Sequence, residues 1–271
     1  MKKLSLKNTW PVKLWHKREL ILALTKREIS AKYKGSAVGL GWALLTPIAM
    51  LGVYTFVFAG IFKARWPGAE NDPAEFAFNL FAGLIVFNVF SEVVNRSPEA
   101  INSNKNLVTK VIFPTETICI SYALSAIAQA VASLAVLIMV LIVWKQEIPM
   151  QWLYIIPAWI PLILLSLCTS WLLATAGTFV KDINHIAAVS TNFILFLSAV
   201  FYPVEALPSK IQFIAKMNPL IPIIAETRNI IINHGQLDMT YIVTGCLIGL
   251  IACTVAYRIF IKASKKFSEF V

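Results

Sequence analysis

Six long apolar stretches constrain this chain more than any other feature of its sequence. A helix that crosses a bilayer needs about 20 mostly apolar residues, and most of the stretches reach that length. Charged residues make up 14% of the 271 residues and mean hydropathy is +0.72, whereas soluble domains usually carry about 25% charged residues. We therefore expect an all-α integral membrane protein with about six transmembrane helices. The predicted spans are residues 39–62, 76–94, 118–144, 157–180, 186–202 and 241–261.

Basic residues are distributed unevenly between the two sides of this predicted membrane domain. Ten of the 24 lysines and arginines precede the first span, and 18 of the 24 lie on the side of the two termini. Loops rich in lysine and arginine stay in the cytoplasm, so we expect both termini there. The net charge of +10 then reflects topology and contact with anionic lipid, and we expect no nucleic acid partner. The expected organisation is a cytoplasmic tail over residues 1–38, a membrane domain over residues 39–262 and a cytoplasmic tail over residues 263–271.

The segment before the first span is rich in charge but also in good helix formers. Trp15, Leu22, Ile29 and Tyr33 recur at helical spacing within residues 13–33 and can form one apolar stripe. We expect an interfacial helix lying under the membrane. The alternative is a solvated cytoplasmic helix.

Two connections between spans are unusually long. Residues 95–117, on the cytoplasmic side, begin polar and then turn apolar, which predicts a short amphipathic helix ending at Pro114; the alternative is an ordinary loop. Residues 203–240, on the outer side, contain the apolar pieces 211–217 and 220–232, each too short to span. We expect two re-entrant helices there, and the alternative is a pair of helices lying flat on the surface.

No pattern for catalysis or metal binding is present in the sequence. It contains no GxxxxGK[ST] loop, no HExxH and no paired carboxylates at useful spacing, and His16, His185 and His234 fall in three separate regions. Ionisable groups inside spans mark ion or proton paths, and here Glu92 is the exception in spans nearly free of them. We expect neither a catalytic site nor a metal site, and an ion-coupled pump or cation channel is disfavoured.

Aromatic and small polar residues are frequent within the spans. Such side chains can line a path for a large amphipathic ligand, or they can pack in a core or face lipid. Phe193 and Phe196 beside Asn192 form the best candidate for a lining face. The full candidate channel-lining set is Tyr54, Phe58, Phe87, Phe90, Asn192, Phe193 and Phe196.

Several motifs together resemble one transporter family. Residues 27–47 read REISAKYKGSAVGLGWALLTP, with the family's recurring features at Arg27, Tyr33, Ser36, Gly39, Trp42 and Pro47. This run resembles the approach to the first span in bacterial ABC-type polysaccharide exporter permeases, the O-antigen, capsule and teichoic acid export family, and most closely the O-antigen permeases. Further similarities follow in order at residues 110–114, at Lys181-Asp182-Ile183 and at Asn218-Pro219 with Arg228. One departure is Lys181, where the family more often has arginine, which weakens any bidentate pairing there.

The resemblance implies a homodimeric permease of the bacterial inner membrane that moves lipid-linked polysaccharide. It further implies that two separate ATP-binding cassette subunits bind ATP and Mg²⁺, so that this chain needs no cofactor and is not itself an enzyme. By the same resemblance, substrate enters at the cytoplasmic interface near Arg27, Lys32, Tyr33 and Lys34, and re-entrant helices within residues 203–240 cap the exit. The ATPase-coupling residues that it implies are Asn104, Lys105, Leu107, Val108, Lys110, Ile112 and Phe113.

Two other functions compete with polysaccharide export at this stage. One is an ABC exporter permease for a small drug or lipid, which the sequence does not separate from a polysaccharide exporter. The other is a membrane-embedded enzyme acting on lipid-linked sugars. The enzyme would need acids or histidines clustered at one leaflet, and the sequence offers no such cluster.

Overall fold

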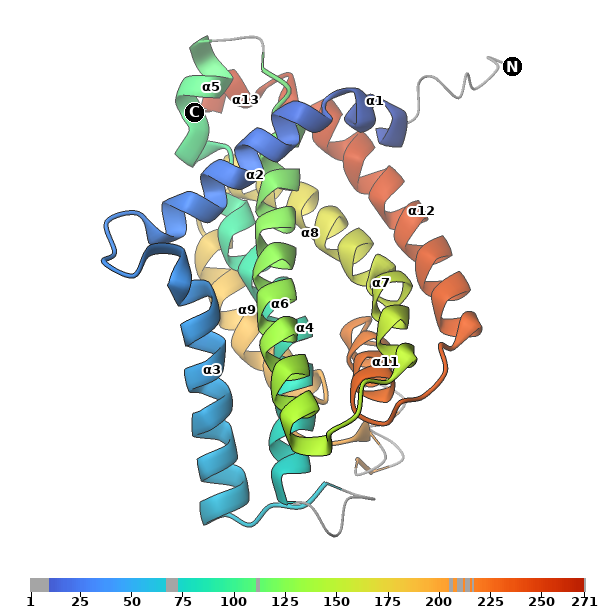
Figure 1. Cartoon of the computed structure of the whole chain (residues 1–271). Helices are drawn as coiled ribbons and strands as arrows, with labels where there is room; N and C mark the ends of the chain where they lie inside the picture. The colour runs from blue at the N-terminus through green and yellow to red at the C-terminus, as the bar shows by residue number, and fades with distance from the viewer. Residues whose placement is uncertain are drawn as a thin grey trace.

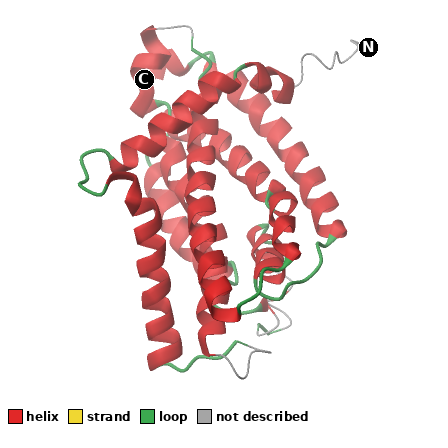
Figure 2. Ribbon diagram, viewed as in Figure 1, coloured by secondary structure: helices red, strands yellow, loops and turns green. Residues whose placement is uncertain are grey.

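Helices account for all the regular secondary structure in the described part of the chain (Figure 2). The structure is a computed structural model that describes residues 10–66, 73–110, 113–204, 207–208, 212, 215 and 217–270, apart from the side chains of Pro73 and Lys110. An all-helical arrangement suits an apolar chain because a helix satisfies its backbone hydrogen bonds within itself, without water.

Five helical segments among the described residues are long and apolar enough to cross a membrane. They agree with five of the six stretches expected from the sequence, with bounds that differ by a few residues at most ends. The fourth begins earlier than expected, because η6 (Met150–Tyr154) and α7 (Ile155–Ala158) precede α8. The five consist of η2 (Gly39–Gly41) with α3 (Trp42–Tyr54) and η3 (Thr55–Ile61), α4 (Pro73–Arg96), α6 (Glu116–Lys145), η6 and α7 with α8 (Ile160–Phe179), and α12 (Met239–Ser264).

The remaining stretch, expected as a span over residues 186–202, is shorter in the structure. It forms α9 (Ile183–Leu197), an apolar helix of 15 residues. Beyond it, Ala199 takes the left-handed conformation with φ of 53°, which an L-residue does not adopt inside a helix. The expectation that the helix continues to Tyr202 was wrong, because an apolar run reports burial and does not require the helix to continue.

α4 is the central helix of the bundle (Figure 1). It packs against α3, α6, α8 and α9 and against the short helix α11 (Leu220–Ile231). In its most apolar window 78% of the residues are buried, against 11% for the first span and 11% for α12. Most apolar side chains of α4 therefore face protein, whereas most of those of α3 and α12 lie on the surface of the chain.

α8 and α12 approach each other closely because glycine allows it. Gly245 and Gly249 lie one turn apart on α12, and a Cβ atom on either would come within 2.9 Å of Pro161 or Leu164 on α8. A pair of glycines at this spacing lets two helix backbones approach inside a membrane, where dispersion contacts replace the hydrophobic effect as the driving force.

Short helices gather at the two ends of the bundle. α1 (Trp10–His16), α2 (Arg18–Tyr33), α5 (Lys105–Lys110) and α13 (Phe267–Phe270) lie at one end, here called the α2 end, and α11 lies toward the other (Figure 1). The second apolar piece of the outer segment is thus confirmed as a helix, whereas the first, residues 211–217, lies mostly outside the described residues.

The amphipathic helix expected to end at Pro114 is shorter than expected. α5 ends at Lys110, residues 111–112 lie outside the described residues, and Phe113 and Pro114 are not helical. The ring of a proline disfavours helical backbone at the residue before it, so Phe113 joins α5 to α6 in another conformation.

Candidate functional site

α2 packs along α6 through a face that the sequence analysis did not select. Its buried side chains include Ile21, Leu24 and Glu28, whereas Trp15 and Leu22 of the expected stripe are 68% and 62% exposed. Neither side chain is buried against protein, and the interfacial position expected for this stripe remains a prediction. A helix at a membrane interface can carry two apolar faces, and spacing alone does not tell which one the protein covers.

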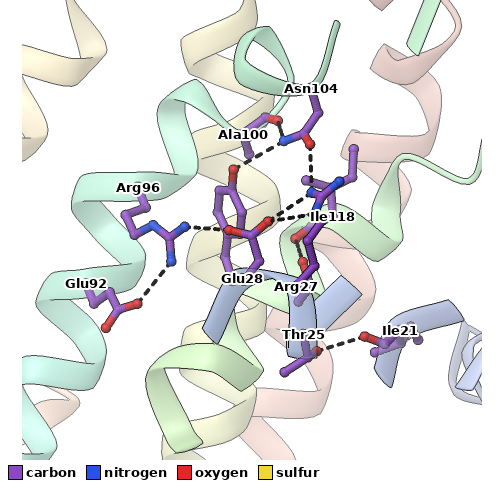
Figure 3. A network of polar contacts seen from close by, with 11 residues as sticks. Ile21, Thr25, Arg27, Glu28, Glu92, Arg96, Ala100, Asn104 and Ile118 are labelled. Carbon is purple, nitrogen blue, oxygen red and sulfur yellow. Dashed lines mark hydrogen bonds and ion pairs between the residues drawn. The ribbon is translucent and has the colours of Figure 1, made fainter. Parts of the chain in front are cut away.

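A buried carboxylate at Glu28 joins α2 to α4 (Figure 3). Glu28 is only 7% exposed and accepts hydrogen bonds from Arg96 at 2.6 Å and from Arg27 at 2.9 Å. Arg96 also donates to Glu92 at 3.2 Å, and Lys32 pairs with Glu92 at 2.6 Å. These five side chains form what we call the Glu28 network, which fixes the second half of α2 on the central helix.

The Glu28 network extends to the connection between α4 and α6. Arg27 donates to the side-chain oxygen of Asn104 at 2.9 Å, and the amide of Asn104 donates to Tyr122 at 3.2 Å and to Ala100 O at 2.9 Å. The guanidinium of Arg96 lies over the Tyr122 ring at 4.4 Å from its centroid. The segment expected to couple to an ATPase is therefore bonded directly to α2.

A second ion pair holds the first half of α2. Lys17 donates to Glu116 at 2.6 Å, and Glu116, at the start of α6, is buried. The sequence analysis missed Lys17, Glu28, Arg96 and Glu116. The available signal was acidic residues within predominantly basic segments, which a count of net charge conceals.

A cavity of about 450 Å³ lies at the end of α2, between α3, α4 and α6. Lys32 and Tyr33, two of the four expected substrate-access residues, line it. Tyr33 donates to the side-chain oxygen of Gln129 at 2.5 Å, and Gln129 donates to Ala43 O at 3.2 Å. Burial, and then the negative charge of Glu92, raise the pKa of Tyr33, so its hydroxyl stays protonated at neutral pH and remains a donor.

The other two expected access residues lie outside this cavity. Arg27 belongs to the Glu28 network, and Lys34 is exposed just beyond the end of α2. The cavity therefore brings together two of the four residues and adds Asn88, Glu92 and Gln129 to them.

The predicted channel-lining residues fall into three separate environments. Tyr54 lines the cavity. Phe87 is buried in the core of the protomer, and Phe58 and Phe90 are partly buried against that core. Asn192, Phe193 and Phe196 are exposed on α9. The protomer thus does not gather these residues around one path.

The predicted coupling residues lie on and around α5. Leu107 is partly exposed, and Val108 and Phe113 are partly buried against the core, while Asn104 directly precedes α5 and Lys105 begins it. α13 packs beside α5. Ile112 and the side chain of Lys110 lie outside the described residues. The coupling role of these two residues, like that of the other five, remains a prediction.

At the other end, Arg228 anchors α11 to two neighbouring segments. It is 7% exposed and donates to Asn79 O on α4 at 2.9 Å, to Ala199 O at 2.9 Å and to Val200 O at 2.6 Å. Its guanidinium also lies over the Trp66 ring at 4.6 Å. The carbonyls that follow α9 are therefore satisfied by a side chain instead of by a further helical turn.

Among the described residues, no three His, Cys, Asp or Glu side chains come together as a metal site. The chemistry available at the α2 end is ion pairing and hydrogen bonding around an amphipathic cavity. Such an arrangement can bind and position a ligand or transmit motion between helices.

Comparison with known proteins places these features in a family. The family profile described as ABC-2 type transporter matches residues 19–232. The O-antigen export system permease protein RfbA of Klebsiella pneumoniae is 22% identical over 252 residues, which cover 93% of this chain and 94% of that protein. RfbA of Myxococcus xanthus is 24% identical over 267 residues, 94% of this chain and 96% of that protein. The polysialic acid transport protein KpsM of Escherichia coli is 26% identical over 246 residues, 87% of this chain and 91% of that protein.

These relatives confirm the resemblance found in the sequence motifs. The profile match extends from the start of α2 to the end of α11 and includes the Glu28 network, the cavity and Arg228. The chain belongs to the ABC-2 type transporter family.

Proposed function

We propose that this chain is the permease subunit of an ATP-driven exporter that moves lipid-linked polysaccharide of O-antigen type across the bacterial inner membrane. The observation that carries the proposal is similarity over nearly the full length of both chains to permeases named for O-antigen export.

The proposed assembly contains two copies of this chain and two ATP-binding cassette subunits, on which ATP and Mg²⁺ bind. The absence of a GxxxxGK[ST] loop from the sequence supports a motor on another chain. The exposed face of α9, where Asn192 lies with Phe193 and Phe196, supports a partner copy or a polar path beside this helix, since an amide facing lipid is unfavourable. The glycan would pass this face, with α11 near the exit.

The proposed orientation has the α2 end and both termini in the cytoplasm. Its support is the excess of basic residues on that side and the position of α1, α2, α5 and α13 at one end of the bundle (Figure 1). In a cysteine-free background, Ser268→Cys on α13 should react with a membrane-impermeant maleimide only after the cells are opened. Labelling from the periplasm of intact cells would contradict this orientation.

The test of function is transport by a purified complex. The chain is copurified with its ATPase, reconstituted into vesicles and supplied with lipid-linked glycan or with small amphipathic drugs. Stimulation of ATP turnover and appearance of glycan in the opposite compartment are expected with the glycan alone. A complex that responds to the drugs and not to lipid-linked glycan would overturn the proposal.

The coupling role of residues 95–117 leads to a prediction for Phe113→Ala. Removing a central aromatic anchor from a docking surface costs about 2 kcal/mol, or about 30-fold in affinity. We expect less copurified ATPase per permease and less surface glycan at matched permease levels. The control is Phe62→Ala, because Phe62 is an exposed aromatic residue at the end of the first span that lies away from α2. Unchanged ATPase ratio and export in Phe113→Ala would show that this residue does not carry the contact, and reduced expression alone would indicate a packing role.

A further inference from the structure

The polar and apolar groups of the cavity at the end of α2 are graded along the bundle axis. Lys32, Tyr33 and Glu92 lie at the α2 end of the cavity, and Asn88 lies one helical turn deeper on α4. Beyond Asn88 the α4 wall is apolar down to Phe81. From Glu92 to Phe81 the helix rises by about 16 Å, roughly half the apolar thickness of a bilayer. The α4 wall of the cavity therefore runs from the membrane surface toward the midplane, polar first and then apolar, while Gln129 and Ser133 line its α6 side.

The polar mouth of the cavity contains Lys32, whose carboxylate partner Glu92 also pairs with a second cation, Arg96. The Glu28 network has three cations, Arg27, Lys32 and Arg96, for the two carboxylates of Glu28 and Glu92. Glu92 is shared between Lys32 at 2.6 Å and Arg96 at 3.2 Å, so its charge is already neutralised when Lys32 turns to another anion. Tyr33 adds a hydroxyl donor beside Lys32. A phosphate at this position would meet an ammonium group and a hydroxyl.

The first span is the least buried of the spans around this cavity. Only 11% of its most apolar window is buried in the protomer, and its residues Thr46, Pro47, Met50 and Tyr54 form one wall of the cavity. A molecule filling the space would contact α3 on one side and α4 and α6 on the other. It would thereby add apolar contact to a span that has little.

We propose that the cavity holds one anionic phospholipid of the cytoplasmic leaflet as a resident ligand. Its phosphate would lie at Lys32 and Tyr33, its ester groups near Asn88, and one acyl chain along Met50 and Leu84. The volume of about 450 Å³ is that of a small-molecule site, which ranges over about 300–1,000 Å³, and the cavity ends at Tyr54 and Phe81 without crossing the bundle. This volume is smaller than that of a whole diacyl lipid, so the cavity would hold the phosphate and one acyl chain, and the second chain would lie outside it against the exposed first span.

This inference rests on membrane insertion and not on the identity of the cargo, so it can fail while the proposed function stands. The permease–ATPase complex is reconstituted into nanodiscs containing equal amounts of phosphatidylglycerol and phosphatidylcholine and then extracted into mild detergent. Native mass spectrometry measures which lipid stays bound per permease copy. We expect one phosphatidylglycerol per copy, retained in preference to phosphatidylcholine.

Two variants, each with a matched control, test the position of the lipid. Lys32→Gln should reduce phosphatidylglycerol retention about fivefold, the equivalent of about 1 kcal/mol for one lysine near an anionic lipid. Lys26→Gln removes an exposed lysine of the same helix outside the cavity and should leave retention unchanged. Met50→Trp fills the apolar wall and should lower retention while keeping every charge. Val53→Trp, on the exposed face of α3 outside the cavity, should not.

Three results would overturn the proposal. Equal retention of phosphatidylcholine, which carries a phosphate but no net charge, would show that the site does not select an anionic lipid. Equal losses of phosphatidylglycerol retention in Lys32→Gln and Lys26→Gln, or in Met50→Trp and Val53→Trp, would show that the lipid binds outside this cavity. Displacement of phosphatidylglycerol by a small molar fraction of polyprenyl phosphate would assign the site to the lipid carrier of the cargo. The preference measured on the unchanged complex stands even if a variant fails to fold.

Discussion

Arg228→Met will lower the thermal stability of the purified permease and reduce export at matched protein levels. Arg228 donates to the carbonyls of Asn79, Ala199 and Val200 within 2.9 Å, and methionine has no donor to replace it. A buried carbonyl left without a partner costs about 1–3 kcal/mol, and these three oxygens lie on two segments that α11 must contact. We expect a total loss of about 3 kcal/mol or more.

The surroundings of Arg228 leave little room for an alternative partner. A Cβ atom built on Gly83 would lie 2.6 Å from the guanidinium, so the site is closed around the planar group. Arg228→Lys keeps the charge but cannot present a fork of donors, and we expect an intermediate loss. Arg65→Met, an exposed arginine at the same end of the molecule, is the control.

The measurement for Arg228 combines thermal unfolding with hydrogen exchange of α11. Faster exchange in α11 and in residues 198–200, with little change at the α2 end, is the expected pattern. If Arg228→Met kept the wild-type melting temperature and the wild-type protection of α11, apolar contacts alone would hold this helix, and the role assigned to the guanidinium would be wrong.

Glu28→Gln will weaken the packing of α2 on α4, because it removes the charge of the central carboxylate of the Glu28 network. Glutamine matches the shape of glutamate but removes the charge that pairs with Arg96 at 2.6 Å. Removing one partner of a buried pair costs about 3–5 kcal/mol. Because the Arg96 side chain is 31% exposed, solvent screens it, and we expect about 2 kcal/mol.

A double-mutant cycle isolates this contact. Glu28→Gln, Arg96→Met and the double variant are compared by thermal or denaturant unfolding, and a coupling of about 1 kcal/mol or more is expected for residues in direct contact. Glu19→Gln, an exposed acid on the same helix, controls for the loss of a negative charge from α2. Additive effects of Glu28→Gln and Arg96→Met would mean that their ion pair does not hold α2.

The function of the complex should respond to Glu28→Gln as well. Arg27 bonds both Glu28 and Asn104, so loosening the network also weakens the link between α2 and the proposed coupling segment. We expect ATP turnover to continue while export per ATP falls. Loss of the ATPase subunit from the complex would instead indicate that the network serves docking.

Of the six spans predicted from the sequence, five correspond to helices long and apolar enough to cross a membrane, because the length and composition of an apolar run are local properties. The sequence also indicated the helical segment before the first span, the helix over residues 220–231, and the family, through motifs at residues 27–47. Lys32 and Tyr33 entered the candidate site through that resemblance, and the structure brings both to the cavity.

What the tertiary structure decided depends on contacts between distant residues. Apolar spacing allowed two buried faces for α2, and packing on α6 selected the one with Ile21, Leu24 and Glu28. The apolar run over residues 186–202 predicted a helix to Tyr202, but α9 ends at Leu197, where Arg228 supplies hydrogen bonds to the carbonyls of Ala199 and Val200 from 28 or more positions away. Glu28 and Arg96 are 68 positions apart, and no local pattern pairs them. Hydropathy is a property of each segment, whereas an ion pair or a buried carbonyl acquires its partner only when the segments pack together.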